Sequence, residues 1–230
     1  MPNITLATLA GINGLNAANQ TVQMAQAQAN GCGAYALVAA AAAFGNPPVA
    51  ENTAIAYNGN NAQLTPADTF PLLAGKVYAL TGILNPSRAL NPLAPELVAA
   101  NGYNSPAAMA QIALTLGRQV IVNITQFGFE SLSPLYPNEQ ERCTAVVGVG
   151  NVRVGTAAVP VNYAVSQPNE TQIVCVQNNL GGLHMLARGA DGNYYDPADG
   201  SLGNNWGDPD SGGFNAASNY MFTGLWLVLS

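Results

Sequence analysis

The chain has 230 residues, of which 49% are hydrophobic and only 8% are charged. This composition predicts a packed globular protein with a sizeable core rather than a disordered chain. Six Lys and Arg residues stand singly along the sequence against twelve Asp and Glu residues, which gives a net charge of −6. Because no basic stripe is available to neutralise phosphates, the sequence disfavours nucleic acids and anionic membranes as partners.

The sequence contains no recognisable targeting or cofactor motif. Residues 1–30 lack Lys and Arg and hold no long apolar run, so we expect no signal peptide. The longest apolar run, 34–44, is too short for a membrane span. The three cysteines leave at least one unpaired and form no zinc-binding pattern, so we expect no disulfide framework, no metal and no other cofactor. These observations predict a cytoplasmic protein or one delivered by a specialised secretion system.

Helical signals dominate the first half of the sequence. Thr65-Pro66 and Ser105-Pro106 each place a capping residue before a proline, an arrangement that favours a helix start. The Gly45-Asn46-Pro47-Pro48 segment is expected to end an alanine-rich helix. The expected helices cover residues 17–29, 32–44, 65–80, 94–100 and 105–116.

Strand signals dominate the second half. Residues 183–188 and 193–196 are predicted to form a hairpin through the Asp-Gly turn at 191–192. Further segments rich in β-branched residues occur at 119–124, 145–149, 161–165, 172–176 and 225–229. We therefore expect a single-domain α+β fold, with a helical lobe over about 1–118 packed on an antiparallel sheet lobe over about 119–230. The active cleft is expected where the two lobes meet.

Cys32 lies in a tight Asn30-Gly31-Cys32-Gly33 turn directly before the alanine-rich helix. A free thiol is mostly protonated at neutral pH, so a nucleophilic cysteine needs its thiolate stabilised. The unpaired backbone N–H groups and the positive dipole end of a first helical turn provide this stabilisation. The alternative is that Cys32 is a small buried residue with no chemical role. Cys143 and Cys175 are interpreted as strand residues that only pack.

His184 is the single histidine of the chain and lies in an apolar strand. A lone histidine among Leu and Met residues is often a core residue, but a Cys–His enzyme needs one on a rigid element. Asp196 follows two tyrosines on the next predicted strand, where its carboxylate can orient the imidazole. Its alternative role is in a turn, although Asp199, before Gly200, suits a turn better.

Two further residues are candidates for the site. Gln26 precedes Cys32 by six positions and can offer its amide N–H to an oxyanion, together with the backbone N–H of Cys32. Trp206 lies in a neutral, Asn-rich segment after the predicted Asp196 strand. It is interpreted either as a substrate-binding platform or as ordinary packing.

These motifs resemble those of the papain-like (clan CA) cysteine peptidases, and their style is closest to the bacteriocin-processing and YopT-type bacterial peptidases. The resemblance is carried by Gln26, Asn30-Gly31-Cys32-Gly33, Leu183-His184-Met185-Leu186 and Tyr194-Tyr195-Asp196-Pro197. The segment 105–124 also resembles the middle of the bacteriocin-processing domain. The sequence departs from papain, which has Trp in place of Gly33 and Asn as the third catalytic residue. It departs from the bacteriocin-processing pattern at Ala34, where that group has Pro.

The resemblance implies a papain-like fold and a cysteine peptidase that acts on a protein or peptide through a thioester acyl-enzyme. Cys32 is then the nucleophile, His184 the general base and acid, Asp196 the orienting residue and Gln26 the oxyanion donor. Acyltransferases, transglutaminases and amidases use the same fold and stay open as alternatives. A non-catalytic structural or interaction module is the alternative from another class, and the oligomeric state also stays open.

Overall fold

A seven-stranded sheet forms the centre of the computed structural model, which describes residues 1–9, 24–45, 48–155, 167–204, 206 and 219–230. The strand order is β10-β9-β8-β7-β11-β5-β6. All neighbours in this sheet are antiparallel except β5 and β6, which are parallel. The strands are β5 (Val120–Thr125), β6 (Val152–Gly155), β7 (Thr171–Asn178), β8 (Leu183–Arg188), β9 (Tyr194–Asp196), β10 (Ser201–Gly203) and β11 (Tyr220–Leu229).

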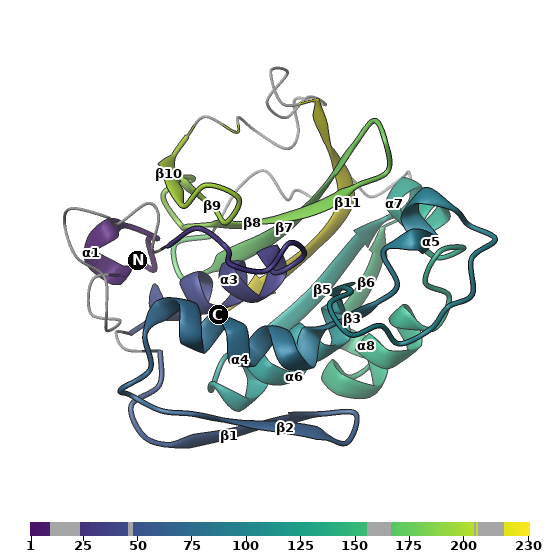
Figure 1. Ribbon diagram of the computed structural model, residues 1–230. Coiled ribbons are helices and arrows are strands. Elements are labelled where there is room, and N and C mark those ends of the chain that lie inside the picture. Colours follow the sequence, from purple (N-terminus) through teal and green to yellow (C-terminus); the bar gives the residue numbers. More distant parts are fainter. Residues whose placement is uncertain (10–23, 46–47, 156–166, 205, 207–218) are drawn as a thin grey trace.

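Helices cover this sheet, with α3 against β7 and β8 and α4 and α6 outside α3 (Figure 1). The longer helices are α3 (Cys32–Ala42), α4 (Phe70–Thr81), α6 (Pro106–Thr115) and α8 (Glu139–Val147). Short ones are α1 (Leu6–Leu9), α5 (Ser87–Leu90), α7 (Gln126–Leu132) and the 3-10 turn η1 (Val149–Asn151). Among the described residues, none of the helices combines the length and hydrophobicity that a membrane span needs.

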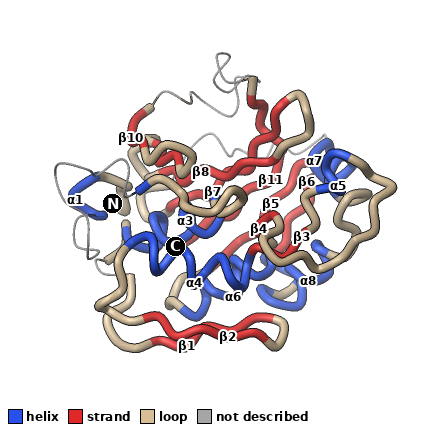
Figure 2. The backbone as a smooth tube through the Cα atoms, in the orientation of Figure 1, coloured by secondary structure: helices blue, strands red, loops and turns tan. Residues whose placement is uncertain are grey.

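Two small antiparallel pairs complete the described structure. The hairpin of β1 (Thr53–Tyr57) and β2 (Asn60–Leu64) lies below the helices and apart from the main sheet (Figure 2). Its turn contains Asn58 and Gly59, both with positive φ angles, which these two residue types tolerate best. The second pair joins β3 (Gly82–Leu84) to β4 (Tyr103–Asn104) and so connects the end of α4 to the start of α6.

The central helix α3 is buried along its whole length. Small alanine side chains allow the helix to lie between the sheet and α4, because they leave room for close approach of the neighbouring elements. The main hydrophobic cluster includes Ile4, Leu37, Leu73, Val122 and Leu229, and so draws residues from both halves of the sequence. The nucleophile candidate therefore lies at the start of a fully buried helix.

The mixed helices and antiparallel-rich sheet confirm the predicted α+β class. The structure also confirms the expected helices beginning at Cys32 and near Ser105, the strands at 120–125 and 171–178, the hairpin of β8 and β9, and the C-terminal strand. Ser105 caps α6 as predicted, because its side chain accepts a hydrogen bond from the Ala108 N–H at 3.2 Å.

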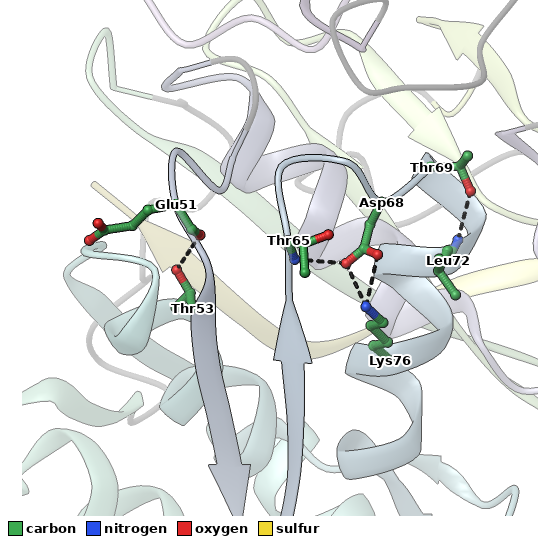
Figure 3. Close-up of polar contacts among 7 residues, drawn as sticks. All are labelled: Glu51, Thr53, Thr65, Asp68, Thr69, Leu72 and Lys76. Atoms are coloured by element: carbon green, nitrogen blue, oxygen red, sulfur yellow. Dashed lines mark hydrogen bonds and ion pairs between the residues drawn. The ribbon is translucent and has the colours of Figure 1, made fainter.

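The helix expected from residue 65 begins only at Phe70. Residues before it form a turn instead, in which the Asp68 carboxylate accepts a hydrogen bond from the Thr65 N–H at 2.8 Å and pairs with the Lys76 ammonium at 2.7 Å (Figure 3). Thr69, rather than Thr65, caps the helix by accepting from the Leu72 N–H at 3.4 Å. The prediction was wrong because two Thr residues compete for the cap, and Asp68 favours the later one.

Two other predicted elements are wrong. Residues 94–100 are not helical, since the Asn85 side chain donates to the Pro95 carbonyl at 2.8 Å and the Ala99 N–H donates to the Ile83 carbonyl at 3.0 Å. These contacts hold the segment along β3. The strand expected at 145–149 is instead the end of α8 and the start of η1, with Gly148 at a φ of 83° between them.

Two predictions fall partly or wholly on residues outside the described ranges. The strand expected at 161–165 lies outside them. The helix expected at 17–29 does so up to residue 23; residue 24 is helical, and residues 25–29 form bends, a turn and irregular backbone rather than a helix.

Candidate active site

Cys32 is the first residue of α3 and is 5% exposed. Gly31 is its N-cap, with φ −78° and ψ −4°, and among the described residues no side chain caps this helix end. The backbone N–H groups of the first turn point toward the end of the helix where Cys32 lies. No side-chain oxygen among the described residues caps this end. This arrangement can stabilise a thiolate or another anion.

His184 and Asp196 meet on neighbouring strands. The Nε2 atom of His184, on β8, lies 2.8 Å from Oδ1 of Asp196, at the end of β9. The two side chains are 8% and 13% exposed. Cys32 lines the same pocket as His184, and it is one of the groups that raise the pKa of His184. Since Nε2 is used by Asp196, the other ring nitrogen, Nδ1, is the one available to the thiol.

His184 and Asp196 each stabilise the charged form of the other. Burial alone lowers the pKa of His184, but the hydrogen bonds and charges of Asp196 and Cys32 outweigh it and raise that pKa to about 10. Burial raises the pKa of Asp196, yet its hydrogen bond and ion pair with His184 bring it below the usual value. The imidazolium–carboxylate pair is therefore the favoured form at neutral pH, and the imidazolium faces the thiol.

Trp206 lies over the His184–Asp196 pair. Its ring centroid is 6.2 Å from that of His184, and its side chain makes a hydrogen bond with Asp196. Tyr220 lies on the same imidazole, with ring centroids 5.8 Å apart. Trp206 is only 4% exposed, so this placement favours the packing interpretation over a platform open to substrate.

Gln26 lies next to the loop that follows Asp196. Its backbone N–H donates to the Pro197 carbonyl at 2.7 Å, which joins the segment before Cys32 to the end of β9. Its side-chain amide donates to the Ala29 carbonyl at 3.0 Å. An amide nitrogen has two hydrogens, and this bond uses one of them. The second hydrogen is the one that an oxyanion would need.

An apolar pocket opens beside the candidate catalytic residues. Cys32 and His184 line it, and its wall includes Val122, Leu132 and Leu225 from β5, α7 and β11. The pocket runs between the sheet and helices α6, α7 and α8. A substrate bound at Cys32 would therefore place one of its groups in an apolar environment.

The other two cysteines also line this pocket. Cys175 lies on β7 as expected, but Cys143 lies on helix α8 and is 2% exposed, so its assignment to a strand was wrong. Burial raises the pKa of Cys175 to about 12 and moves the pKa of Cys143 in the same direction. Neither thiol is suited to act as a nucleophile at neutral pH.

Comparison with known protein families supplies an independent observation. Residues 24–230 match the family described as invasion plasmid antigen J, cysteine protease. The chain belongs to this cysteine protease family. No curated protein and no solved structure matches the chain. The match begins just before Gln26 and contains every residue of the site described above.

Sequence reasoning missed Asn104, which lines the pocket beside Cys32 and is 2% exposed. It also gave no packing role to Gly33. A Cβ atom at Gly33 would lie 2.6 Å from Asn104 Cβ and 2.8 Å from Met185 Sδ, so glycine is needed for packing. No local pattern reveals Asn104, because its partner Asn30 is 74 positions away in the sequence.

Proposed function

We propose that this member of the invasion plasmid antigen J family is a papain-like peptidase that acts through a Cys32–His184–Asp196 triad. The observation that carries the proposal is the position of His184, which bonds to Asp196 through Nε2 and lines one pocket together with Cys32. Nucleophile, proton carrier and orienting group then follow in the order that thiol catalysis requires. The main hydrophobic cluster, shared by both halves of the sequence, supports one papain-like domain.

The acylation step begins with the Cys32 thiolate attacking the carbonyl carbon of the scissile amide. A C–S bond forms and the carbonyl electrons move to oxygen, which gives a tetrahedral oxyanion. The backbone N–H of Cys32 and the second amide hydrogen of Gln26 are the proposed donors to this oxyanion. When the intermediate collapses, the C–N bond breaks and the His184 imidazolium gives its proton to the leaving amine.

Deacylation reverses these roles. Neutral His184 takes a proton from water, the resulting hydroxide attacks the thioester, and the C–S bond breaks to restore the thiolate. Asp196 holds Nε2 throughout, so that Nδ1 stays directed at the reacting atoms. In this proposal Trp206 covers the imidazole–carboxylate pair and excludes water, since it is buried and bonds to Asp196.

The substrate is expected to be a protein or peptide, as the family description implies. The apolar pocket at Cys32 and His184 predicts a large apolar group next to the scissile bond. The style of the motifs relates the proposed site to the bacteriocin-processing and YopT-type bacterial cysteine peptidases. Of the two locations that the sequence allows, the name "invasion plasmid antigen" favours delivery by a secretion system.

The proposal is tested with p-nitrophenyl acetate, a small ester that acylates reactive thiols. Wild type is expected to release a burst of nitrophenolate and to carry one acetyl group on Cys32, located by peptide mass spectrometry. Cys32→Ala and His184→Ala should show neither. Acetyl groups scattered over several residues, or a burst that survives loss of His184, would overturn the triad and support a non-catalytic module.

A further inference from the structure

The peptide bond between Asn30 and Gly31 is held from both of its sides. The Asn30 carbonyl accepts a hydrogen bond from Asn104 Nδ2 at 2.7 Å. The Gly31 N–H of the same peptide plane donates to the Gln28 carbonyl at 3.0 Å. Because a peptide unit is planar, these two bonds fix its orientation one residue before the nucleophile.

The amide of Asn104 is itself held in one orientation. Its Oδ1 accepts a hydrogen bond from the Thr81 hydroxyl at 2.7 Å, and both side chains are buried, at 2% and 0% exposure. The Asn30 carbonyl can only accept, so it selects the orientation with Nδ2 toward Asn30, and the Thr81 hydroxyl then donates to Oδ1. A turned amide would face the Asn30 carbonyl with an oxygen and lose that bond.

The nucleophile turn is also held by packing against Asn104 and by a hydrogen bond to Asn101. The Asn104 Cβ occupies the space that a side chain at Gly33 would need. The side chain of Asn30 donates to the Asn101 carbonyl at 3.0 Å. The short segment 101–104 thus contacts Asn30, which precedes the Gly31-Cys32 pair, and Gly33, which follows it.

We propose that Asn104 is a positioning residue for catalysis, and that Asn30, Thr81 and Asn104 form a clamp that sets the direction of the Cys32 backbone N–H. This inference rests on the proposed function, because that N–H is the backbone donor to the oxyanion. A small rotation of the Asn30–Gly31 plane is passed to the Gly31–Cys32 plane through the N-cap residue. The N–H would then point away from the oxyanion although the thiol remains in place.

This role separates two reactions of the same thiol. Acylation by p-nitrophenyl acetate passes through a tetrahedral oxyanion and needs the N–H donor. Alkylation by iodoacetamide displaces iodide at a saturated carbon and forms no oxyanion. A loosened clamp should therefore slow acylation of Cys32 much more than alkylation of Cys32.

The test measures both rates at Cys32 for wild type, Asn104→Ala, Thr81→Val and Thr81→Ser. Asn104→Ala should slow acylation by about 10- to 100-fold and alkylation by less than about 3-fold. Thr81→Val frees the Asn104 amide to turn and should slow acylation by about 3- to 10-fold. Thr81→Ser keeps the hydroxyl and should react like wild type.

Thr223→Val is the matched control. Thr223 is also buried, and its hydroxyl donates to the Cys175 carbonyl on β7 at 2.8 Å and accepts from the Leu225 N–H at 3.2 Å, whereas the clamp bonds join Asn104 to Thr81 and Asn30. It should leave the ratio of the two rates unchanged. The clamp would be overturned if the ratio of acylation to alkylation rates in Thr81→Val equalled that of wild type. It would also be overturned if Thr223→Val shifted this ratio by the same amount. Both outcomes can be read even if Asn104→Ala fails to fold. If the triad proposal itself is wrong, wild type should show no selective acylation of Cys32, which distinguishes this outcome from a failure of the clamp.

Discussion

The two halves of the candidate site are held in place by different means. His184 and Asp196 lie on adjacent strands of one hairpin, and backbone pairing holds each of them, His184 opposite Val176 of β7 and Asp196 opposite Ser201 of β10. Cys32 lies at a helix start whose approach is fixed by side chains from distant segments, Asn104 above all. The sheet-borne pair therefore depends on local backbone pairing, and the nucleophile turn depends on long-range polar contacts.

This difference predicts that substitutions in the two halves lower activity in different ways. Substitutions in the pair should change protonation and leave the position of the pair intact, because the strands remain. Substitutions around the turn should change position, because no regular hydrogen-bond ladder supports it. The variants below are chosen to separate protonation effects from positional effects.

The largest effect is expected for Cys32→Ala, which removes the nucleophile itself. Acylation by p-nitrophenyl acetate should fall by at least about 10³-fold, with little change in the melting temperature. Stopped-flow absorbance at the nitrophenolate band measures the rate. A residual burst comparable to wild type would show that another residue is acylated.

Asp196→Ala should slow acylation by about 10² to 10⁴-fold, because the imidazole loses its orienting carboxylate. Asp196→Asn keeps an accepting oxygen near Nε2 but removes the charge that helps to raise the pKa of His184 to about 10. The high-pH limit of acylation should therefore move to lower pH in Asp196→Asn, while the low-pH limit moves less. Unchanged pH limits would contradict the assignment of His184 as the proton donor.

The same pair predicts a pH dependence of stability. The pKa of His184 is about 10 in the folded protein, above its unfolded value of about 6.5, so its contribution is complete below about pH 6.5. This contribution is lost as the pH rises through about 10. The Asp196 pKa is lowered on folding, so its contribution is present above its unfolded pKa and lost on acidification. Thermal unfolding of wild type and Asp196→Ala should therefore converge at both pH extremes, and a constant difference would argue against the ion pair.

Gly33→Ala tests the turn by packing. The added Cβ would meet Asn104 Cβ at 2.6 Å and Met185 Sδ at 2.8 Å, and we expect destabilisation of about 1–3 kcal/mol. Gly150→Ala is the control, since its Cβ would meet nothing within 4 Å. Urea unfolding measures both. Equal stability of the two variants would show that Asn104 does not pack tightly against the nucleophile turn at Gly33.

The smallest effect is expected for Trp206→Phe. This change keeps an aromatic ring near His184 but removes the indole N–H that bonds to Asp196. One lost hydrogen bond of about 1 kcal/mol corresponds to an acylation rate lowered about 5-fold. Trp226→Phe, in the same hydrophobic cluster, is the matched control and should keep the wild-type rate. A rate equal in both variants would leave Trp206 with a packing role only.

The same contrast explains what the sequence could and could not predict. The β8–β9 hairpin was predicted from an Asp-Gly turn between apolar runs, which are signals within fourteen residues. The hydrogen bond between His184 and Asp196 was an expectation that follows from this hairpin. Local patterns of this kind also predicted α3, α6 and the central strands, because turn residues, caps and periodicity act over short distances.

Errors occurred where non-local contacts decide the local structure and where local helix-start signals were overlooked. Residues 94–100 have helix-forming side chains but are held along β3 by Ile83 and Asn85. The apolar residues 145–147 suggest a strand, yet they complete a helix whose first turn carries Glu139 and Glu141. The Asn104 contact to Asn30 spans 74 positions and has no local signature. Such contacts became visible only in the folded structure.

The central claim is that His184 activates Cys32, and the most direct measurement is the rate of iodoacetamide labelling at each cysteine across pH. Peptide mass spectrometry reads the three rates separately in wild type and in His184→Ala. We predict that wild-type Cys32 is labelled rapidly at about pH 6, where a free thiol is almost fully protonated, and that His184→Ala slows it strongly. Cys143 and Cys175 should react slowly in both proteins. Labelling of Cys32 that matches those two buried thiols and ignores the loss of His184 would contradict the account.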